Sequence, residues 1–181
     1  MESKEKIGDS GEVLSTREGC VFLIDDNPIF TTILEGGLRK VLPNVTIKHF
    51  HSGESALVEM DQNPFLVFLD YDLAGVQTDV MNGIKVLKAI KNFNPSTEVI
   101  MLSTVEDPRI VAATMKHGAF DYIPKDEKAL FDVRHKLSGI LRKLRISDEV
   151  KEERKINWFL IWGAIIILLC ALLGFIFTEY S

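Results

Sequence analysis

Residues 21–28 read Val-Phe-Leu-Ile-Asp-Asp-Asn-Pro, an apolar run that stops at two acids and a helix-start signal. Four consecutive apolar residues are typical of a strand that is covered on both faces of a parallel sheet. Asn27 before Pro28 is typical of a helix beginning, because Asn caps the first turn and proline fits its first position. The stretch therefore predicts the first strand–helix unit of an α/β sheet, with two aspartates at the junction.

The same alternation of apolar run and helical pattern recurs along the chain. The predicted strands are Cys20–Ile24, Val45–Phe50, Phe65–Leu69, Glu98–Leu102 and Ala119–Ile123. The predicted helices are Pro28–Val41, Gly53–Asp61, Asn82–Lys91, Pro108–His117 and Glu127–Leu144. Strands that alternate with helices predict the α/β class, here a doubly wound five-stranded parallel sheet with helices on both faces. In such sheets ligands bind at the carboxyl ends of the strands.

Polar side chains follow the predicted strands at that edge. They are Asp25, Asp26, Asp70, Asp72, Ser103, Tyr122 and Lys125. Several carboxylates in one cleft raise each other's pKa, and a hard cation with oxygen ligands, usually Mg²⁺, relieves the repulsion. A lysine and a hydroxyl beside such a cation favour a site for a phosphoryl group. The set predicts metal-assisted phosphoryl transfer to a carboxylate.

Five short motifs lie in order between about Gly19 and Leu144. They are Val21-Phe22-Leu23-Ile24-Asp25-Asp26, Phe68-Leu69-Asp70, Met81-Asn82-Gly83, Val99-Ile100-Met101-Leu102-Ser103 and Gly118-Ala119-Phe120-Asp121-Tyr122-Ile123-Pro124-Lys125. None is specific by itself, but together they resemble the receiver domain of two-component response regulators. The resemblance implies a flavodoxin-like, chemotaxis-type sheet with strand order 2-1-3-4-5.

The resemblance implies that Asp70 is the phosphoacceptor, which attacks a phosphohistidine or a small phosphodonor. It implies a Mg²⁺ site formed by Asp25, Asp26, Asp70 and the backbone carbonyl of Asp72. The expected protein is a phosphorelay switch and not an enzyme, and its expected partner is a histidine kinase or a phosphotransfer protein. A dimer of receivers is a further arrangement that the resemblance allows.

The resemblance assigns the other three side chains to the phosphoryl group and its readout. Ser103 is expected to hydrogen-bond a phosphoryl oxygen, and Lys125 to pair with the phosphoryl group or with the phosphoacceptor. Tyr122 matches the aromatic switch that moves inward when Ser103 is drawn to that group. Positive charge near the transferring oxygens and correct positioning account for most of the catalysis in such sites.

The segment after the phosphoacceptor departs from the family pattern. Thirteen positions separate Asp70 from Gly83, more than is usual, and the extra residues fall within Leu73–Val80. Ala74 replaces the usual proline. Because this loop borders the predicted site, access of the phosphodonor is a separate question.

Two single residues also depart from the pattern. Asp126 follows Lys125, where the family has a proline after a typically cis bond. A non-proline cis bond costs about 3–4 kcal/mol, so a trans bond is expected, with Asp126 free to cap the last helix. Thr104 after Ser103 is bulkier than usual and narrows the predicted entry to Asp70.

Two alternative functions stay open. One is a receiver-like scaffold that binds partners without being phosphorylated, which the altered loop and Asp126 favour. The other is a phosphatase, because Asp70-Tyr71-Asp72 also resembles the first motif of haloacid-dehalogenase-type enzymes. Those enzymes carry their paired acids after the lysine, whereas Asp25 and Asp26 come first here, so the motif order favours the receiver.

The chain combines 26% charged residues with a mean hydropathy of +0.12. The apolar excess lies at one place, Trp158–Phe177, 20 residues without a charge. As a helix this run spans about 30 Å, the thickness of a bilayer core, so a transmembrane helix is predicted over a buried core helix. Trp158, Trp162 and Tyr180 sit where interfacial aromatics are expected, and basic residues precede the run. The positive side should stay cytoplasmic.

The predicted organisation is a mobile polar tail (1–18), a receiver (19–146), a charged helical connector (147–156), one transmembrane helix (157–178) and a short tail (179–181). The first 19 residues lack the apolar segment of a signal peptide. A net charge of −5 argues against a nucleic-acid partner. We therefore expect a single-pass protein of the cell (inner) membrane whose receiver faces the cytoplasm.

Overall fold

The computed structural model describes the backbone of residues 18–73 and 81–179. Side chains are described over the same ranges except residues 147–157, 167–168 and 170–179. Two compact units divide between Ile140 and Leu141. The first contains the sheet and its helices, and the second contains the rest of the C-terminal helix.

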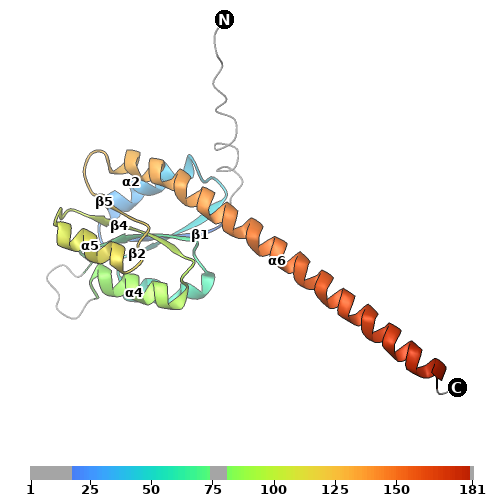
Figure 1. The fold of residues 1–181 in the computed structure, drawn as a ribbon. Coiled ribbons are helices and arrows are strands. Elements are labelled where there is room, and N and C mark those ends of the chain that lie inside the picture. Colours follow the sequence, from blue (N-terminus) through green and yellow to red (C-terminus); the bar gives the residue numbers. More distant parts are fainter. Residues whose placement is uncertain (1–17, 74–80, 180–181) are drawn as a thin grey trace, which may run out of the picture. The chain divides into compact units, whose positions relative to one another are not determined.

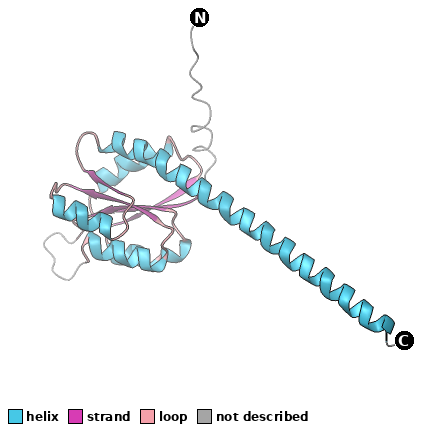
Figure 2. Cartoon of the chain, viewed as in Figure 1, coloured by secondary structure: helices cyan, strands magenta, loops and turns pink. Residues whose placement is uncertain are grey.

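A five-stranded parallel sheet forms the centre of the first unit (Figures 1 and 2). Its strands are β1 (Gly19–Ile24), β2 (Val45–Phe50), β3 (Leu66–Asp70), β4 (Glu98–Ser103) and β5 (Asp121–Pro124). They lie in the order β2-β1-β3-β4-β5 and all four pairings are parallel. The predicted fold and strand order are confirmed, and the predicted strand ends shift by at most two residues.

Helices return the chain from each strand to the next. They are α2 (Pro28–Arg39), α3 (Gly53–Val58), the 3-10 turn η1 (Met60–Gln62), α4 (Gly83–Phe93), α5 (Pro108–Lys116) and α6 (Ala129–Glu179). Figures 1 and 2 show α2 and the first turns of α6 on one face of the sheet, and α4 and α5 on the other. Both faces are therefore covered, as the apolar strand sequences predict.

The helix starts follow the predicted cap chemistry. The Asn27 side chain accepts hydrogen bonds from the backbone N–H groups of Ile29 and Phe30. Asp107 accepts one from Arg109 in the same way. At the other end of α5, Gly118 has φ +88°, a left-handed conformation that lets the chain turn sharply into β5.

Two apolar layers hold the sheet between its helices. The cluster on the α3 and α4 side joins Phe22, Ile24, Val67, Leu69, Val86, Leu87, Ile90, Val99 and Met101, all at most 1% exposed. Alternate residues of the same strands, among them Leu23, Phe68 and Ile100, are equally buried. This two-sided burial fixes the register of every strand, since a shift of one residue would exchange the two faces.

The start of α4 lies against the backbone at the end of β3. A Cβ added at Gly83 would lie 2.5 Å from the Asp70 carbonyl oxygen and 2.7 Å from Tyr71 Cα. Because both neighbours are backbone atoms, they cannot swing aside as a side chain could. Gly83→Ala is expected to lower the free energy of unfolding by about 1–3 kcal/mol in urea denaturation.

Gly36 provides the matched control for that substitution. It lies inside α2, and a Cβ there meets no atom within 4 Å. Gly36→Ala is expected to raise the free energy of unfolding by about 0.5–1 kcal/mol, because alanine loses less chain entropy in a helix. Equal effects of the two substitutions would contradict the proposed close approach of α4 to β3.

The last helix is longer than the predicted receiver helix Glu127–Leu144. α6 continues without interruption to Glu179, consistent with a sequence that has no proline after Asp126. The predicted transmembrane helix 157–178 is not identified as one: within the part of the chain that the structure describes, no helix combines the length and hydropathy needed to cross a bilayer. Most side chains beyond residue 166 lie outside the described residues.

Candidate functional site

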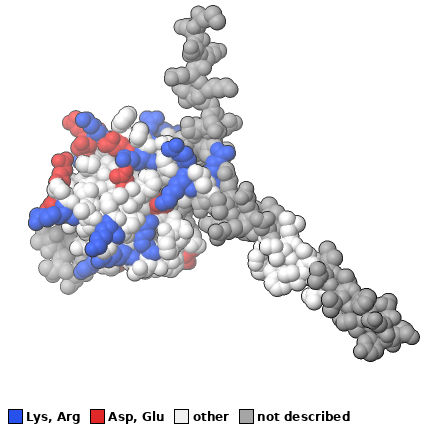
Figure 3. All heavy atoms as spheres, viewed as in Figure 1, with Lys and Arg blue, Asp and Glu red and all other residues white. Residues whose placement is uncertain are grey.

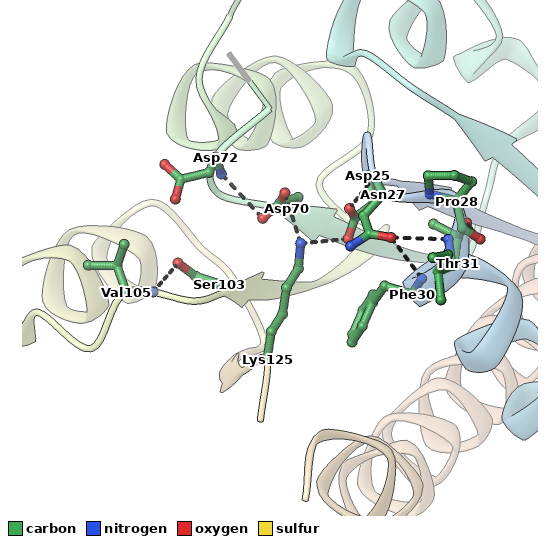
Figure 4. Close-up of polar contacts among 11 residues, drawn as sticks. Asp25, Asn27, Pro28, Phe30, Thr31, Asp70, Asp72, Ser103, Val105 and Lys125 are labelled. Carbon is green, nitrogen blue, oxygen red and sulfur yellow. Dashed lines mark hydrogen bonds and ion pairs between the residues drawn. The ribbon is translucent and has the colours of Figure 1, made fainter. Parts of the chain in front are cut away.

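Three carboxylates and one lysine meet at the carboxyl edge of the sheet. One carboxylate oxygen from each of Asp25, Asp26 and Asp70 lies within 4.8 Å of the other two. Lys125 Nζ lies 2.7 Å from Asp25 Oδ2 and 2.8 Å from Asp70 Oδ2. Figure 4 shows Asp25, Asp70 and Lys125 pointing toward one another from three different strand ends. The site thus carries three negative charges and one positive charge.

Burial makes these charges interact strongly. Asp25 and Asp70 are 2% and 3% exposed, and Asp26 is exposed. Burial raises the pKa of Asp70 above its ordinary value; Lys125 opposes the rise, and the charge of Asp25 adds to it. Burial by itself would lower the pKa of Lys125, but the hydrogen bonds to Asp25 and Asp70 outweigh it and raise that pKa. Lys125 therefore stays cationic at neutral pH.

Backbone N–H groups orient the two buried carboxylates. Asn27 N donates to Asp25 Oδ1 at 3.0 Å, and Asp72 N donates to Asp70 Oδ1 at 3.2 Å. Each bond spans two residues, so the turn after the strand fixes the side chain at its end. The Asp72 side chain is exposed, and Figure 4 shows its carboxylate turned away from Lys125.

Ser103 and Tyr122 are joined through the turn after β4. Asp70 pairs with Leu102 in the sheet, which places Ser103 one residue beyond it on the neighbouring strand. The buried Ser103 Oγ accepts a hydrogen bond from Val105 N at 3.0 Å. The Tyr122 hydroxyl donates to the carbonyl oxygen of the same Val105. One residue of the turn therefore links the predicted phosphoryl contact to the predicted switch.

The residue after Lys125 has the expected backbone and a capping role. No peptide bond among the described residues is cis, so the Lys125–Asp126 bond is trans, as predicted. The Asp126 carboxylate accepts a hydrogen bond from Lys128 N at 2.8 Å, directly before α6 begins. Lys125 N also donates to the Ser103 carbonyl oxygen at 2.7 Å, which ties β5 to β4 beside the site.

The long loop after Asp70 lies mostly outside the described residues, which resume at Met81. Met81 N donates to the Glu54 carboxylate at 2.8 Å, and Gly83 N donates to the Tyr71 carbonyl oxygen at 3.0 Å. The bond from Met81 lowers the pKa of Glu54. Glu54 on α3 therefore holds Met81, which lies two residues before α4, by a hydrogen bond to its backbone.

Sequence reasoning missed two residues near the site. The Phe30 ring centroid lies 5.1 Å from Lys125 Nζ, a cation–π contact that adds to the hold on the lysine. Its signal was available, because the first turn of α2 starts at the carboxyl edge and its side chains face that edge. Glu54 had no such signal, because only the folded chain brings α3 to the end of the loop.

The carboxylates fit a divalent cation. Asp25, Asp26 and Asp70 offer only oxygen ligands, the type that Mg²⁺ prefers, and Lys125 offsets one of the three negative charges. The donor set therefore supports the predicted metal site at this edge.

Comparison with known proteins identifies the family of this chain. The family model for the response regulator receiver domain matches residues 21–133. The DNA-binding transcriptional regulator NtrC of Salmonella typhimurium is 26% identical over 142 residues, which are 78% of this chain and 28% of NtrC. The nitrogen assimilation regulatory protein NtrX of Azorhizobium caulinodans is 28% identical over 76% of this chain and 29% of its own length. This chain thus spans less than a third of these relatives.

Solved structures agree with this placement. The crystal structure of NtrX from Brucella abortus superimposes with a TM-score of 0.62 and 27% identity, over 77% of this chain and 31% of that one. The receiver domain of a LuxO repressor protein from Vibrio parahaemolyticus shares the fold, with a TM-score of 0.64 over 74% of this chain and 98% of that one. The range that the family model matches, residues 21–133, contains Asp25, Asp26, Asp70, Ser103 and Lys125. The chain belongs to the response regulator receiver domain family.

Proposed function

We propose that this protein is a membrane-anchored receiver that a histidine kinase or phosphotransfer protein phosphorylates on Asp70. The observation that carries the proposal is the pair of ion pairs from Lys125 to Asp25 and Asp70, at 2.7 and 2.8 Å. These ion pairs hold the Asp70 carboxylate, the Asp25 carboxylate and the Lys125 ammonium group together at the carboxyl edge of the sheet. The receiver would act as a localised phosphorelay switch through protein contacts.

In the proposed reaction Asp70 Oδ2, which Lys125 contacts at 2.8 Å before the donor binds, attacks the phosphorus in line. The bond between phosphorus and the donor nitrogen breaks, the electron pair leaves with the imidazole, and an acyl phosphate forms on Asp70. Asp72 N holds Asp70 Oδ1 and orients the carboxylate during the attack. Lys125 remains close enough to exchange its contact with Asp70 for one with the phosphoryl oxygens.

Asp25, Asp26, Asp70 and the backbone carbonyl of Asp72 are the groups that would hold Mg²⁺. When bound, the cation supplies positive charge that offsets the negative charge of the transferring phosphoryl group. Ser103 would hydrogen-bond a phosphoryl oxygen and release Val105 N. Because the Tyr122 hydroxyl is hydrogen-bonded to the Val105 carbonyl oxygen, a movement of Val105 would also move Tyr122, the predicted aromatic switch.

The phosphorylation is tested with the full chain in detergent or vesicles, with Mg²⁺ and a small acyl phosphate donor. We expect an acid-stable, base-labile label that requires Mg²⁺ and disappears with EDTA. Absence of a label with several donors, in a protein whose fold is intact by circular dichroism, would favour the scaffold function instead.

The proposed anchor rests on the C-terminal apolar run. Residues 158–177 contain no charge. Five consecutive side chains of α6, from Trp158 to Trp162, are each 47–74% exposed, so apolar surface surrounds the helix on all sides. A helix that is apolar all round requires an apolar environment, which a bilayer provides. We propose that this helix crosses the cell membrane with the receiver on the cytoplasmic side.

The anchor is tested by flotation with neutral phosphatidylcholine vesicles. We expect the full chain to float with the vesicles and to resist extraction by high salt and alkaline carbonate. Placing arginines at Ile165 and Leu169, near the middle of the run, is expected to abolish flotation, because a charge at the bilayer centre costs about 2.5–3.5 kcal/mol. A chain that stays in the soluble fraction would contradict the anchor.

Asp72 gives a separate prediction about the lifetime of the phosphorylated state. Its carboxylate is exposed, two residues from the phosphoacceptor, and it adds negative charge where a hydrolytic water would approach. We expect Asp72→Ala to change the decay rate of phospho-Asp70 by roughly three- to tenfold. The decay of the purified labelled protein measures it, and an unchanged rate would remove any role for this side chain.

A further inference from the structure

The topology gives the receiver two edges of different character. Every strand ends at the carboxyl edge, where the site lies, and the helices α2, α3, α4 and α5 run back and end at the amino edge. α6 begins after β5, so its residues 129–140 also run back to the amino edge. The chain therefore leaves the receiver at the amino edge, on its way to the proposed anchor.

A group of basic side chains extends from the middle of α4 to the C-terminal ends of α4 and α5. Its members, named here the α4–α5 basic cluster, are Lys88, Lys91, Lys116 and His117. The two helices together contain five Lys or Arg residues and no acid. Figure 3 shows Lys and Arg side chains gathered over the region where α4 lies in Figure 1.

The members of the α4–α5 basic cluster lie close to one another. The pKa of His117 is lowered first by burial and then by the charges of Lys88 and Lys116. Lys91 runs along the turn after α5, since a Cβ added at Gly118 would lie 3.6 Å from Lys91 Cε. Lys91 Nζ donates to the Thr97 carbonyl oxygen at 2.6 Å, which fixes this lysine at the amino edge.

Two lysines of the α4–α5 basic cluster, Lys88 and Lys116, have no acidic partner among the ion pairs of the described residues. Two acids of the amino edge have other partners: Glu59 pairs with Lys48 at 3.0 Å and Asp121 with Lys136 at 2.5 Å. The carboxyl edge, in contrast, carries Asp25, Asp26, Asp70, Asp72, Glu106, Asp107, Asp126 and Glu127. The carboxyl edge is therefore acidic even with its bases Lys85, Arg109, Lys125 and Lys128, whereas the α4–α5 basic cluster is locally basic.

Apolar side chains project from the same two helix ends. Phe93 in the last turn of α4 is 58% exposed, and Met115 in the last turn of α5 is 44% exposed. Lysines next to an exposed aromatic side chain are typical of surfaces that bind at the boundary between lipid headgroups and acyl chains. The helix dipole accounts for a basic residue in the last turn of each helix, but not for the exposed Phe93 and Met115.

We propose that the α4–α5 basic cluster binds the anionic headgroups of the bilayer that holds the C-terminal helix. The inference rests on the proposed anchor, which keeps the receiver near the surface and makes a weak electrostatic contact effective. The contact turns the amino edge toward the membrane. The carboxyl edge, with Asp70 and its acidic rim, then faces the cytoplasm and away from like-charged lipid.

Energy transfer between the receiver and the lipid tests the orientation. The full chain, with Cys20 and Cys170 replaced by Ala, carries a donor dye at Ser96→Cys, in the exposed turn between α4 and β4. A second version carries the dye at Glu127→Cys, at the carboxyl edge. Both are reconstituted into vesicles of phosphatidylcholine alone or mixed with phosphatidylglycerol, with acceptor dyes on the headgroups.

We expect transfer from position 96 to rise at least about twofold in the anionic vesicles and to fall again at high salt. Transfer from position 127 should not rise. The double variant Lys88→Glu with Lys116→Glu should lose the rise. The matched double variant Lys85→Glu with Lys128→Glu changes the net charge equally at the carboxyl edge, and it should keep the rise.

The outcomes separate this inference from the proposed anchor. If neutral vesicles do not retain the chain, the anchor fails and the inference fails with it. If both vesicle types retain the chain but transfer from position 96 is the same in both, only the inference is overturned. The α4–α5 basic cluster would then bind an acidic protein, or it would only offset the dipoles of its two helices. Loss of the rise in both double variants overturns it too, because net charge then decides the effect.

Discussion

Asp70→Asn is expected to abolish the acyl phosphate label completely while leaving the fold intact. The amide keeps the size and shape of the side chain, but it cannot accept a phosphoryl group as an acyl phosphate. Lys125 keeps its ion pair with Asp25 at 2.7 Å, so the charged centre of the site survives. Phosphorylation with a small donor and Mg²⁺ measures the loss, with Asp72→Asn as the control that should retain the label.

The same variant should be more stable than the native protein when no Mg²⁺ is bound. The pKa of Asp70 is raised in the fold, so the ionised carboxylate opposes folding at neutral pH. As the pH rises from 3.8, the pKa of Asp70 in the unfolded chain, through its higher pKa in the folded protein, the native protein loses stability that the variant keeps. We therefore expect the free energy of unfolding of the variant to be higher than that of the native protein at pH 7 in EDTA. A less stable variant, or a label that persists, would contradict the assigned role of Asp70.

Lys125→Met is expected to cause the largest loss of stability in the receiver. It leaves Asp25 and Asp70, whose side chains are 2% and 5% exposed, without their shared cation. Removal of one partner from a buried ion pair typically costs about 3–5 kcal/mol, because the remaining charge is buried and unpaired. Urea denaturation at pH 7 in EDTA measures the effect. Lys128→Met, which removes an exposed lysine three residues later, should change stability by less than about 0.5 kcal/mol.

Two further measurements identify the charge as the cause. The double variant Lys125→Met with Asp70→Asn should recover at least about half of the loss, because one unpaired carboxylate is then neutral. The pKa of Lys125 is raised in the fold, so its stabilising contribution is fully present below 10.5 and is lost as pH rises through the folded value. A loss below about 1 kcal/mol for the single variant would show that the two ion pairs contribute little.

The sequence predicted the strands and their parallel arrangement because local patterns carry that information. Val21-Phe22-Leu23-Ile24 is apolar on both faces, so only a doubly covered strand suits it, and Asn27-Pro28 specifies the helix that follows. The resemblance then supplied the order of the strands. The sequence predicted which polar residues lie together for a related reason, since parallel strands all end at the same edge of the sheet and the residues that follow them become neighbours.

Other features depended on contacts between segments far apart in the chain. The hydrogen bond from Met81 N to Glu54, the contact of Phe30 with Lys125 and the link from Ser103 through Val105 to Tyr122 each join separate elements. No periodicity records such contacts. The α4–α5 basic cluster is of the same kind, because Lys88 and Lys116 are 28 positions apart in the sequence and only the folded chain brings both near His117.

The sequence by itself determined the α/β class, the polar residues at the carboxyl edge of the sheet and the location of the apolar run, because each is encoded in consecutive residues or in a fixed local spacing. Only the tertiary structure decided that one lysine pairs with two buried aspartates and that Lys88 and Lys116 both lie near His117. The physical reason is distance: electrostatic and hydrogen-bond energies depend on separations of a few ångströms, which packing of the helices on the sheet sets and sequence separation does not.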